Sequence, residues 1–177
     1  AAQPLVRDLL AGRNKNPKTA EIQLDENGEE ICYHPKKFNL PEPVLKPVDE
    51  NFVTWYINTI KNSPEKVTIV PVGPLTNIAI VLRAEPSLVD NIEEIVIMGG
   101  GHDVRNSTAA AEFNIWKDPE AAEIVLNSGA KITLVPLDAT HAASTRLSEA
   151  QQYRDLHTSV GDLFAELIEI RTRAYNI

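Results

Sequence analysis

From residue 48 onward, short apolar segments alternate with stretches of helical periodicity, and this alternation constrains the fold most strongly. The apolar segments are 67–72, 95–98 and 131–135. Runs of this length, bounded by Gly or Pro, are typical of buried strands. The stretches around them place apolar residues three or four positions apart, as on one face of a helix. The alternation predicts an α/β fold with a mostly parallel sheet and helices on both faces.

Polar residues and prolines mark the expected ends of these elements. A first helix should follow an Asp49 cap, a second should span 75–83, and a third should begin at Asp118 and Pro119. Pro71 has no N–H to donate, so the first strand should lose its pairing near that residue. The tail is predicted to be helical over 148–157 and 159–174.

A polar, proline-rich segment, 13–47, precedes this regular part of the chain. Its turn sequence Asp25-Glu-Asn-Gly28 is typical of a hairpin, which would pair 21–24 with 30–33. A chain of 177 residues has the size of about one domain. We therefore expect one α/β domain over 1–177, in which 13–47 forms an insertion or a lid.

Composition argues against several classes of protein. The chain has 17 Lys and Arg against 25 Asp and Glu, a net charge of −8, and lacks the basic cluster expected of a nucleic-acid-binding protein. No apolar run approaches the roughly 18 residues of a membrane span, so no membrane partner is expected. The single Cys32 excludes an internal disulfide framework and a multi-cysteine metal site. A reducing cytoplasm is the expected compartment.

The loops that follow the predicted strands are the expected place for a ligand. In parallel α/β sheets, ligands bind outside the carboxyl ends of the strands. Here these loops are 73–77, 99–114 and 136–142, and all are rich in glycine or small polar residues. The architecture therefore predicts a site where the three loops converge.

The glycine run 99–101 does not have the spacing of a nucleotide-phosphate loop. Neither G-x-G-x-x-G at the start of a helix nor G-x-x-x-x-G-K-[ST] occurs in the chain. Three glycines after a strand instead permit a close turn with positive φ, with or without a ligand beside it. The histidines lack metal-type spacing, and there is no Gly-x-Ser-x-Gly elbow for an acyl-transfer serine.

Glu112 and Asn114 flank Phe113 in a segment that is expected to be extended and to precede a helix. Residues i and i+2 of an extended chain point to the same side, so a carboxylate and an amide would share one face. Such a pair suits vicinal hydroxyls, which donate and accept hydrogen bonds, and Asn106 could join from the other limb of the loop. The alternative is that Glu112 and Asn114 only cap the following helix, and the residue types alone leave both interpretations open.

The chain contains four further segments in this order: VGPLTNIA (72–79), IVIMGGG (95–101), NSTAAAEFNIWKDPEAA (106–122) and LVPLDATH (134–141). In order and in spacing, they resemble successive signatures of the inosine-uridine preferring nucleoside hydrolases. The similarity runs from about Pro41 to Arg173, and residues 1–7 also resemble a segment of the family. It implies an open, mostly parallel α/β core and a calcium-dependent enzyme of nucleoside salvage. The implied reaction cleaves the N-glycosidic bond of ribonucleosides to ribose and free base.

The resemblance also implies roles for individual residues. Asn106, Glu112 and Asn114 would hold the ribose, and Met98 would lie under the sugar. Thr76 would offer its backbone carbonyl to Ca²⁺, a hard cation that prefers oxygen ligands. The implied partner is a small-molecule nucleoside, and homo-oligomers, as dimers or tetramers, are usual for the family.

The chain also departs from the family pattern. The N-terminal D-x-D-x-G-x-D-D cluster, which supplies most calcium ligands and the catalytic base, does not occur, so no catalytic residue is identified in this chain. The late His-Asp pair would fall after residue 177, and the middle H-G-x-x-G-L motif is missing. Near its expected place stands His34, followed by Pro35 instead of the glycine, so His34 receives no role.

We expect the chain to be an internal piece of a full-length hydrolase, because the acidic cluster and the late His-Asp pair would both lie beyond its ends. The alternative is a nucleoside- or ribose-binding relative without catalysis, which would keep Asn106, Glu112 and Asn114. The sequence leaves open whether the base is a purine or a pyrimidine, since the regions that face the base in the family are absent or divergent here.

Overall fold

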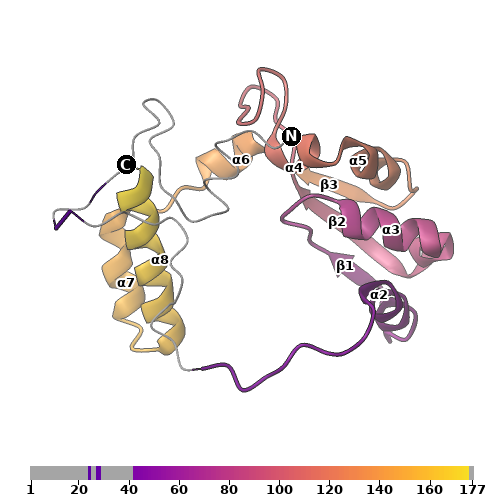
Figure 1. The fold of residues 1–177 in the computed structure, drawn as a ribbon, viewed down its shortest axis with the longest axis horizontal. Helices are drawn as coiled ribbons and strands as arrows, with labels where there is room; N and C mark the ends of the chain where they lie inside the picture. Colours follow the sequence, from indigo (N-terminus) through magenta and orange to yellow (C-terminus); the bar gives the residue numbers. More distant parts are fainter. Residues whose placement is uncertain (1–23, 25–26, 29–41, 176–177) are drawn as a thin grey trace. The chain divides into compact units, whose positions relative to one another are not determined.

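The computed structural model describes residues 24, 27–28 and 42–175 of the chain (Figure 1). Its contacts form two compact units, Pro47–Ser144 on the one hand and Ala1–Lys46 with Thr145–Ile177 on the other. The hairpin expected within 21–33 falls almost wholly outside the described residues, as does most of 13–47. The single domain and the lid therefore stay predictions.

The unit Pro47–Ser144 contains a parallel sheet of three strands in the order β1-β2-β3 (Figure 1). Ile95 of the central strand is aligned with Ile69 on one side and with Ile132 on the other. The predicted class, α/β with an open parallel sheet, is confirmed. The strands are β1, Val67–Ile69, β2, Ile92–Met98, and β3, Ile132–Val135.

The first strand is shorter than the apolar run that predicted it. It ends at Ile69, two residues before Pro71, as the missing N–H of proline required. The chain nevertheless continues beside β2, because the Pro71 carbonyl accepts a hydrogen bond of 3.0 Å from the backbone N–H of Met98. The loop after β1 therefore starts level with the end of β2.

Three helices pack together with the sheet. They are α2, Phe52–Lys61, α3, Thr76–Ala84, and α5, Pro119–Leu126, and a short 3-10 helix, η1, Pro86–Asn91, follows α3. The predicted cap of the first helix is wrong: Asn51, and not Asp49, is the N-cap, and its side chain accepts from the Val53 N–H. A cap has to reach the second or third helical amide, and from Asn51 the Val53 amide is that group.

The core lies between α2, α3 and α5 and one face of the sheet. Ile95 and Ile97 of β2 are fully buried there, in one cluster with Leu75, Val81 and Val125 from the helical side. On the opposite face Glu94 accepts a hydrogen bond from Thr133 and lies 3.6 Å from the Lys131 ammonium. The buried cluster holds the helix starts in a set position relative to the ends of the strands. Helices on the second face stay a prediction for the whole protein.

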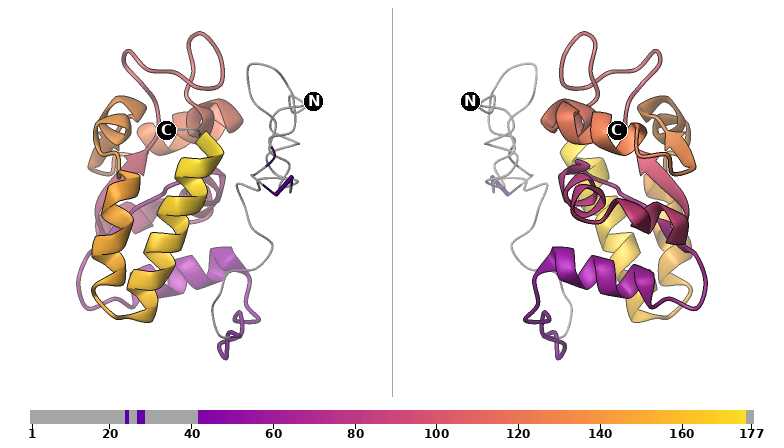
Figure 2. Two further views of the ribbon diagram at one scale, coloured as in Figure 1. Left: turned by 90° about the vertical axis from the view of Figure 1, so that its left-hand side faces the viewer. Right: turned by 90° about the vertical axis from the view of Figure 1, so that its right-hand side faces the viewer.

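The second unit contains a helical hairpin, as the periodicity of the tail predicted. Its elements are η2, Leu147–Glu149, α7, Ala150–Arg154, and α8, Ser159–Tyr175, and α7 and α8 run side by side (Figure 2). The Arg154 Nη2 atom donates to both carboxylate oxygens of Glu169 at 2.8 Å, and the Tyr153 and Phe164 rings are stacked with their centroids 5.8 Å apart. None of the helices in the described part is long and apolar enough to cross a lipid bilayer.

Candidate functional site

Two of the three loops expected to form a site are joined directly by backbone hydrogen bonds. After β2 the chain passes through Gly99 and Gly100 toward α4, Phe113–Lys117, and after β3 it enters α6, Leu137–Ala142. The Gly99 N–H donates to the Val135 carbonyl at 3.2 Å, and the Leu137 N–H donates to the Gly100 carbonyl at 2.9 Å. The two loops therefore form one continuous surface at the carboxyl ends of β2 and β3.

Glu112 is the N-cap of α4 and is only 3% exposed. One carboxylate oxygen, Oε2, accepts from the backbone N–H groups of Gly100 at 3.1 Å, Asn114 at 2.9 Å and Ile115 at 3.4 Å. The expectation of an extended segment is wrong, because the helix already begins at Phe113, where a carboxylate satisfies the free amides of the first turn. No described residue donates to the other oxygen, Oε1.

Asn114 is buried as well, at 8% exposure, and its amide is oriented by the end of β2. The Nδ2 group donates to the Met98 carbonyl at 3.0 Å and lies 3.2 Å from the Met98 sulfur. Because that carbonyl can only accept, the nitrogen must face it, and the oxygen Oδ1 points elsewhere. Within the described chain Oδ1 receives no hydrogen bond. Met98 and Asn114, which were singled out separately, are thus in direct contact.

Asn106, on the other limb of the loop, contacts the backbone of Phe113, which lies between Glu112 and Asn114. Its Oδ1 accepts a hydrogen bond of 2.8 Å from the backbone N–H of Phe113 and a longer one of 3.4 Å from the Ser107 hydroxyl. Because a backbone N–H can only donate, the oxygen must face Phe113, and the Nδ2 group keeps both of its hydrogens available among the described residues. Asn106, Glu112 and Asn114 therefore offer one donor group and two acceptor oxygens.

The glycine run after β2 serves the turn that begins this loop. Gly100 has φ of +73°, a conformation that glycine adopts without strain. At Gly101 a Cβ atom would lie 2.0 Å from the backbone oxygen of Val104, so any side chain would collide with the chain itself. Backbone geometry therefore accounts for the glycines at positions 100 and 101.

Sequence reasoning missed Asp138, the second residue of α6. Its carboxylate accepts hydrogen bonds from the backbone amides of three successive residues, His102, Asp103 and Val104, at 2.7, 2.9 and 3.1 Å. These amides hold the pKa of the Asp138 carboxyl at about 2, below its ordinary value of 3.8. The available signal was a lone carboxylate in a loop that follows a strand, but its partners lie 34 to 36 residues earlier in the chain.

Thr76 is the first residue of α3, and its hydroxyl donates to the Asp118 carboxylate. That hydrogen bond, together with one from the Ala121 amide, lowers the pKa of Asp118, which is the N-cap of α5 as predicted. Ca²⁺ requires about six to eight oxygen ligands. In the part of the chain that the structure describes, no group of three or more His, Cys, Asp or Glu side chains could hold a metal ion. These residues therefore do not form a calcium site by themselves.

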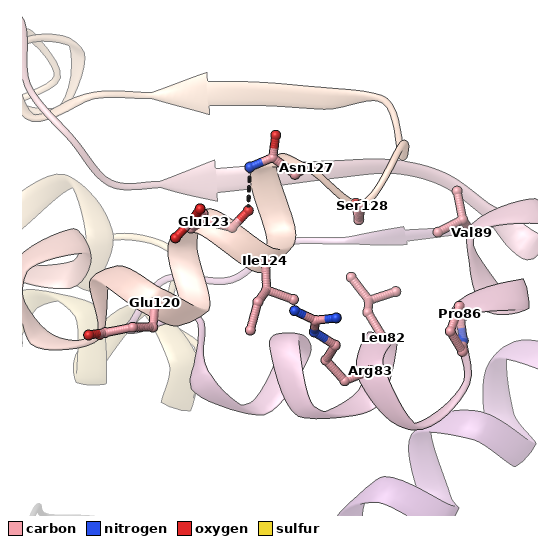
Figure 3. A pocket seen from close by; sticks show the side chains of 9 residues that line it. All are labelled: Leu82, Arg83, Pro86, Val89, Glu120, Glu123, Ile124, Asn127 and Ser128. Carbon is pink, nitrogen blue, oxygen red and sulfur yellow. Dashed lines mark hydrogen bonds between the residues drawn. The ribbon is translucent and has the colours of Figure 1, made fainter.

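A groove of about 620 Å³ lies elsewhere in this unit (Figure 3). It runs along α5, beside the end of α3 and the start of η1, and Arg83 points into the space near Ile124. Ser128 and Val89, which lead toward the beginnings of β3 and β2, also line it. The groove is therefore near the amino ends of the strands and contains none of the sugar-facing candidates.

Comparisons with known proteins agree with the motifs. The family model described as inosine-uridine preferring nucleoside hydrolase matches residues 1–177. A pyrimidine-specific ribonucleoside hydrolase, RihA, of Salmonella newport is 40% identical over 169 residues, which are 96% of this chain and 50% of that protein. The chain thus spans about half the length of the curated relatives it matches.

Solved structures show the same likeness. A purine-preferring ribonucleoside hydrolase from Gardnerella vaginalis is 36% identical, with a TM-score of 0.70 over 78% of this chain and 44% of that chain. A plant nucleoside hydrolase, PpNRh1, is 26% identical, with a TM-score of 0.69 over 87% of this chain and 53% of that chain.

Proposed function

The chain belongs to the inosine-uridine preferring nucleoside hydrolase family, and we propose that the whole protein hydrolyses the N-glycosidic bond of ribonucleosides to ribose and free base. The observation that carries the proposal is the pair Glu112 and Asn114, which are buried beside the end of β2 and each keep one oxygen that no described residue donates to. A buried acceptor that lacks a partner costs about 1–3 kcal/mol, so a ligand hydroxyl that supplies the missing donor is favoured there.

The three side chains suit a sugar with neighbouring hydroxyls. One hydroxyl donates to Glu112 Oε1 and another to Asn114 Oδ1, while the Asn106 Nδ2 group donates to a hydroxyl oxygen. We place Met98 under the sugar ring, because its sulfur lies 3.2 Å from the Asn114 amide. The backbone hydrogen bonds described above already orient all three polar side chains, so little ordering is required when the sugar binds.

This arrangement also favours the bond cleavage itself. Water adds its oxygen to the anomeric carbon, the carbon–nitrogen bond breaks, and the departing base takes up a proton. The sugar gains positive charge in an oxocarbenium-like transition state, which makes its hydroxyls more acidic and strengthens their hydrogen bonds to an acceptor. A carboxylate at Glu112 therefore binds the transition state more tightly than the substrate.

Calcium dependence is part of the proposal for the whole protein, with the Thr76 backbone carbonyl as one ligand. The carbonyl oxygen of Thr76 has two lone pairs, so it can accept a hydrogen bond within α3 and coordinate a cation at the same time. Since the described residues do not complete a metal site, we assign no step of the reaction to the metal. We also propose a cytoplasmic homo-oligomer that acts in nucleoside salvage, with no nucleic-acid or membrane partner.

The proposal concerns the sugar and leaves the base to experiment. Inosine and uridine should both be assayed with the whole protein in the presence of Ca²⁺, by release of the base and of reducing sugar. Calorimetry should measure binding in parallel. Hydrolysis of either nucleoside supports the proposal. Binding without hydrolysis would favour the ribose-binding alternative, and neither binding nor hydrolysis would refute both.

A further inference from the structure

One carboxylate ties the loop after β2 to the loop after β3. Asp138 Oδ2 accepts from the His102 amide at 2.7 Å, and Oδ1 accepts from the amides of Asp103 at 2.9 Å and Val104 at 3.1 Å. Hydrogen bonds from backbone N–H groups to a carboxylate are charge-assisted and stronger than neutral ones. Asp138 itself is anchored, since it follows directly on Leu137, whose N–H donates to the Gly100 carbonyl.

The same turn, residues 101–105, is also held on its carbonyl side. The Arg105 guanidinium donates to the Asp103 carbonyl at 2.8 Å and to the His102 carbonyl at 2.9 Å. The absence of a side chain at Gly101 lets the Val104 carbonyl approach closely, as described above. The 101–105 turn is therefore bound by one anion at its amides and by one cation at its carbonyls.

The 101–105 turn leads directly into Asn106. The Asn106 side chain is held at its far end by the Phe113 amide, and its backbone is held by the turn that precedes it. A displacement of the turn would move the Asn106 Nδ2 group relative to Glu112 and Asn114, which are held independently by Gly100 and Met98. We propose that Asp138 is a positioning residue, which fixes the 101–105 turn to the end of β3 and thereby aims the Asn106 amide at the ribose. This inference rests on the proposed function.

A role in α6 alone does not account for this geometry. A carboxylate in the first turn of a helix interacts favourably with the free amides of that helix. The three amides bound by Asp138, however, belong to a loop 34 to 36 residues earlier. The low pKa of the carboxyl, about 2, agrees with this and keeps the anion in place throughout the physiological range of pH.

The test compares variants of the whole protein on a ribonucleoside and on its 2′-deoxy and 3′-deoxy analogues. Asp138→Ala removes both acceptor oxygens, whereas Asp138→Asn keeps one. Asp103→Asn is the matched control, because it removes a carboxylate from the same turn. The Asp103 side chain is 84% exposed, and its ion pair among the described residues is with the neighbouring His102 ring. Arg105→Gln loosens the turn from its other side and serves if the Asp138 variants fail to fold.

We expect kcat/KM to fall roughly ten- to a hundredfold in Asp138→Ala and by less in Asp138→Asn, because small misplacements of a binding group have effects of about this size. Asp103→Asn should stay within about twofold of the parent, since it breaks none of the three hydrogen bonds. Discrimination against one deoxy analogue should shrink in the Asp138 variants. Amide exchange should accelerate at residues 102–104 while the rest of the protein keeps its protection.

Folded Asp138 variants with parental kinetics and parental discrimination would overturn the inference, as would an equal loss in Asp103→Asn. If the Asp138 variants do not fold, loss of discrimination in Arg105→Gln supports the inference and parental kinetics in that variant overturns it. If the parent binds nucleosides without hydrolysis, the Kd replaces kcat/KM in every comparison. A parent that neither binds nor hydrolyses refutes the proposed function, and the role of Asp138 then fails with it.

Discussion

Replacing Glu112 by glutamine separates its role as the N-cap of α4 from its proposed role as a ligand of the ribose. The Oε2 atom accepts from the backbone amides of Gly100, Asn114 and Ile115, and Oε1 is the oxygen that we propose for the sugar. Glutamine has nearly the same shape and keeps one acceptor oxygen. That oxygen can take the place of Oε2, but the second group is then an NH₂ donor, without negative charge.

The expected effect on stability differs between glutamine and alanine. In Glu112→Ala the helix loses its cap, at about 1 kcal/mol, and the Gly100 amide loses its partner, at about 1–3 kcal/mol. The free energy of unfolding should therefore fall by about 2–4 kcal/mol. In Glu112→Gln hydrogen bonds to a charged acceptor become hydrogen bonds to a neutral one, and the expected loss is about 1 kcal/mol.

The expected effect on activity is large in both variants. A hydrogen bond to a charged group contributes about 1.5–3 kcal/mol, and about 1.36 kcal/mol corresponds to a factor of ten. The kcat/KM of Glu112→Gln on a ribonucleoside should therefore fall about ten- to a hundredfold, together with part of the discrimination against the deoxy analogue. Denaturant unfolding and steady-state kinetics of the whole protein measure the two effects.

A matched control is Asn51→Ala, which removes the cap of α2, a helix that contributes no residue to the proposed site. It should lower the free energy of unfolding by about 1 kcal/mol and leave kcat/KM unchanged. If Glu112→Gln behaves like this control, with parental kinetics and discrimination, the carboxylate is only a helix cap and the ribose interpretation is wrong.

Three further changes test the same loop. Asn114→Asp would place a second acceptor against the Met98 carbonyl at the end of β2. We expect the free energy of unfolding to fall by about 1–3 kcal/mol and kcat/KM to fall as well, as measured by denaturant unfolding and steady-state kinetics. Unchanged values would contradict the assigned orientation of the Asn114 amide. Gly101→Ala would put a Cβ 2.0 Å from the Val104 oxygen, and it should deprotect the loop amides in hydrogen exchange; parental protection would show that the turn tolerates a side chain. The carboxyl of Asp138 has a lowered pKa of about 2, so its stabilising effect is complete above its ordinary value of 3.8 and disappears as the pH falls through about 2. Amides 102–104 should therefore keep their protection, corrected for intrinsic exchange, from pH 7 to about 4, and release near pH 6 would refute this.

The order of strands and helices followed from local patterns in the sequence. Apolar runs located β1, β2 and β3, and Pro71 correctly predicted where β1 loses its pairing. Asp118 was recognised as the cap of α5 because a cap depends on amides only two or three residues away. Such interactions are readable from sequence, since the partners are neighbours along the chain.

The resemblance to the family likewise singled out Asn106, Glu112, Asn114 and Met98 from motifs, without showing how they are arranged. The structure brings them together, but by a different geometry from the one expected. Glu112 and Asn114 do not alternate along a strand; the first caps the helix in which the second lies. The same few residues allow either a strand or the start of a helix, and the hydrogen bond from the Gly100 amide is one of the contacts that decide between them.

Only the tertiary structure shows which polar atoms remain available. Asn114 turns its oxygen away from Met98, and Asn106 turns its oxygen toward Phe113, so one amide offers an acceptor and the other a donor. Asp138 holds a turn that lies 34 to 36 residues away, and this contact depends on how β2 and β3 are aligned in the sheet. Residue types set what each side chain is able to donate or accept. The register of β2 and β3 decides that Asp138 meets the turn, and the folding of the loop between β2 and α4 decides which atoms of Asn106, Glu112 and Asn114 are satisfied by the described residues.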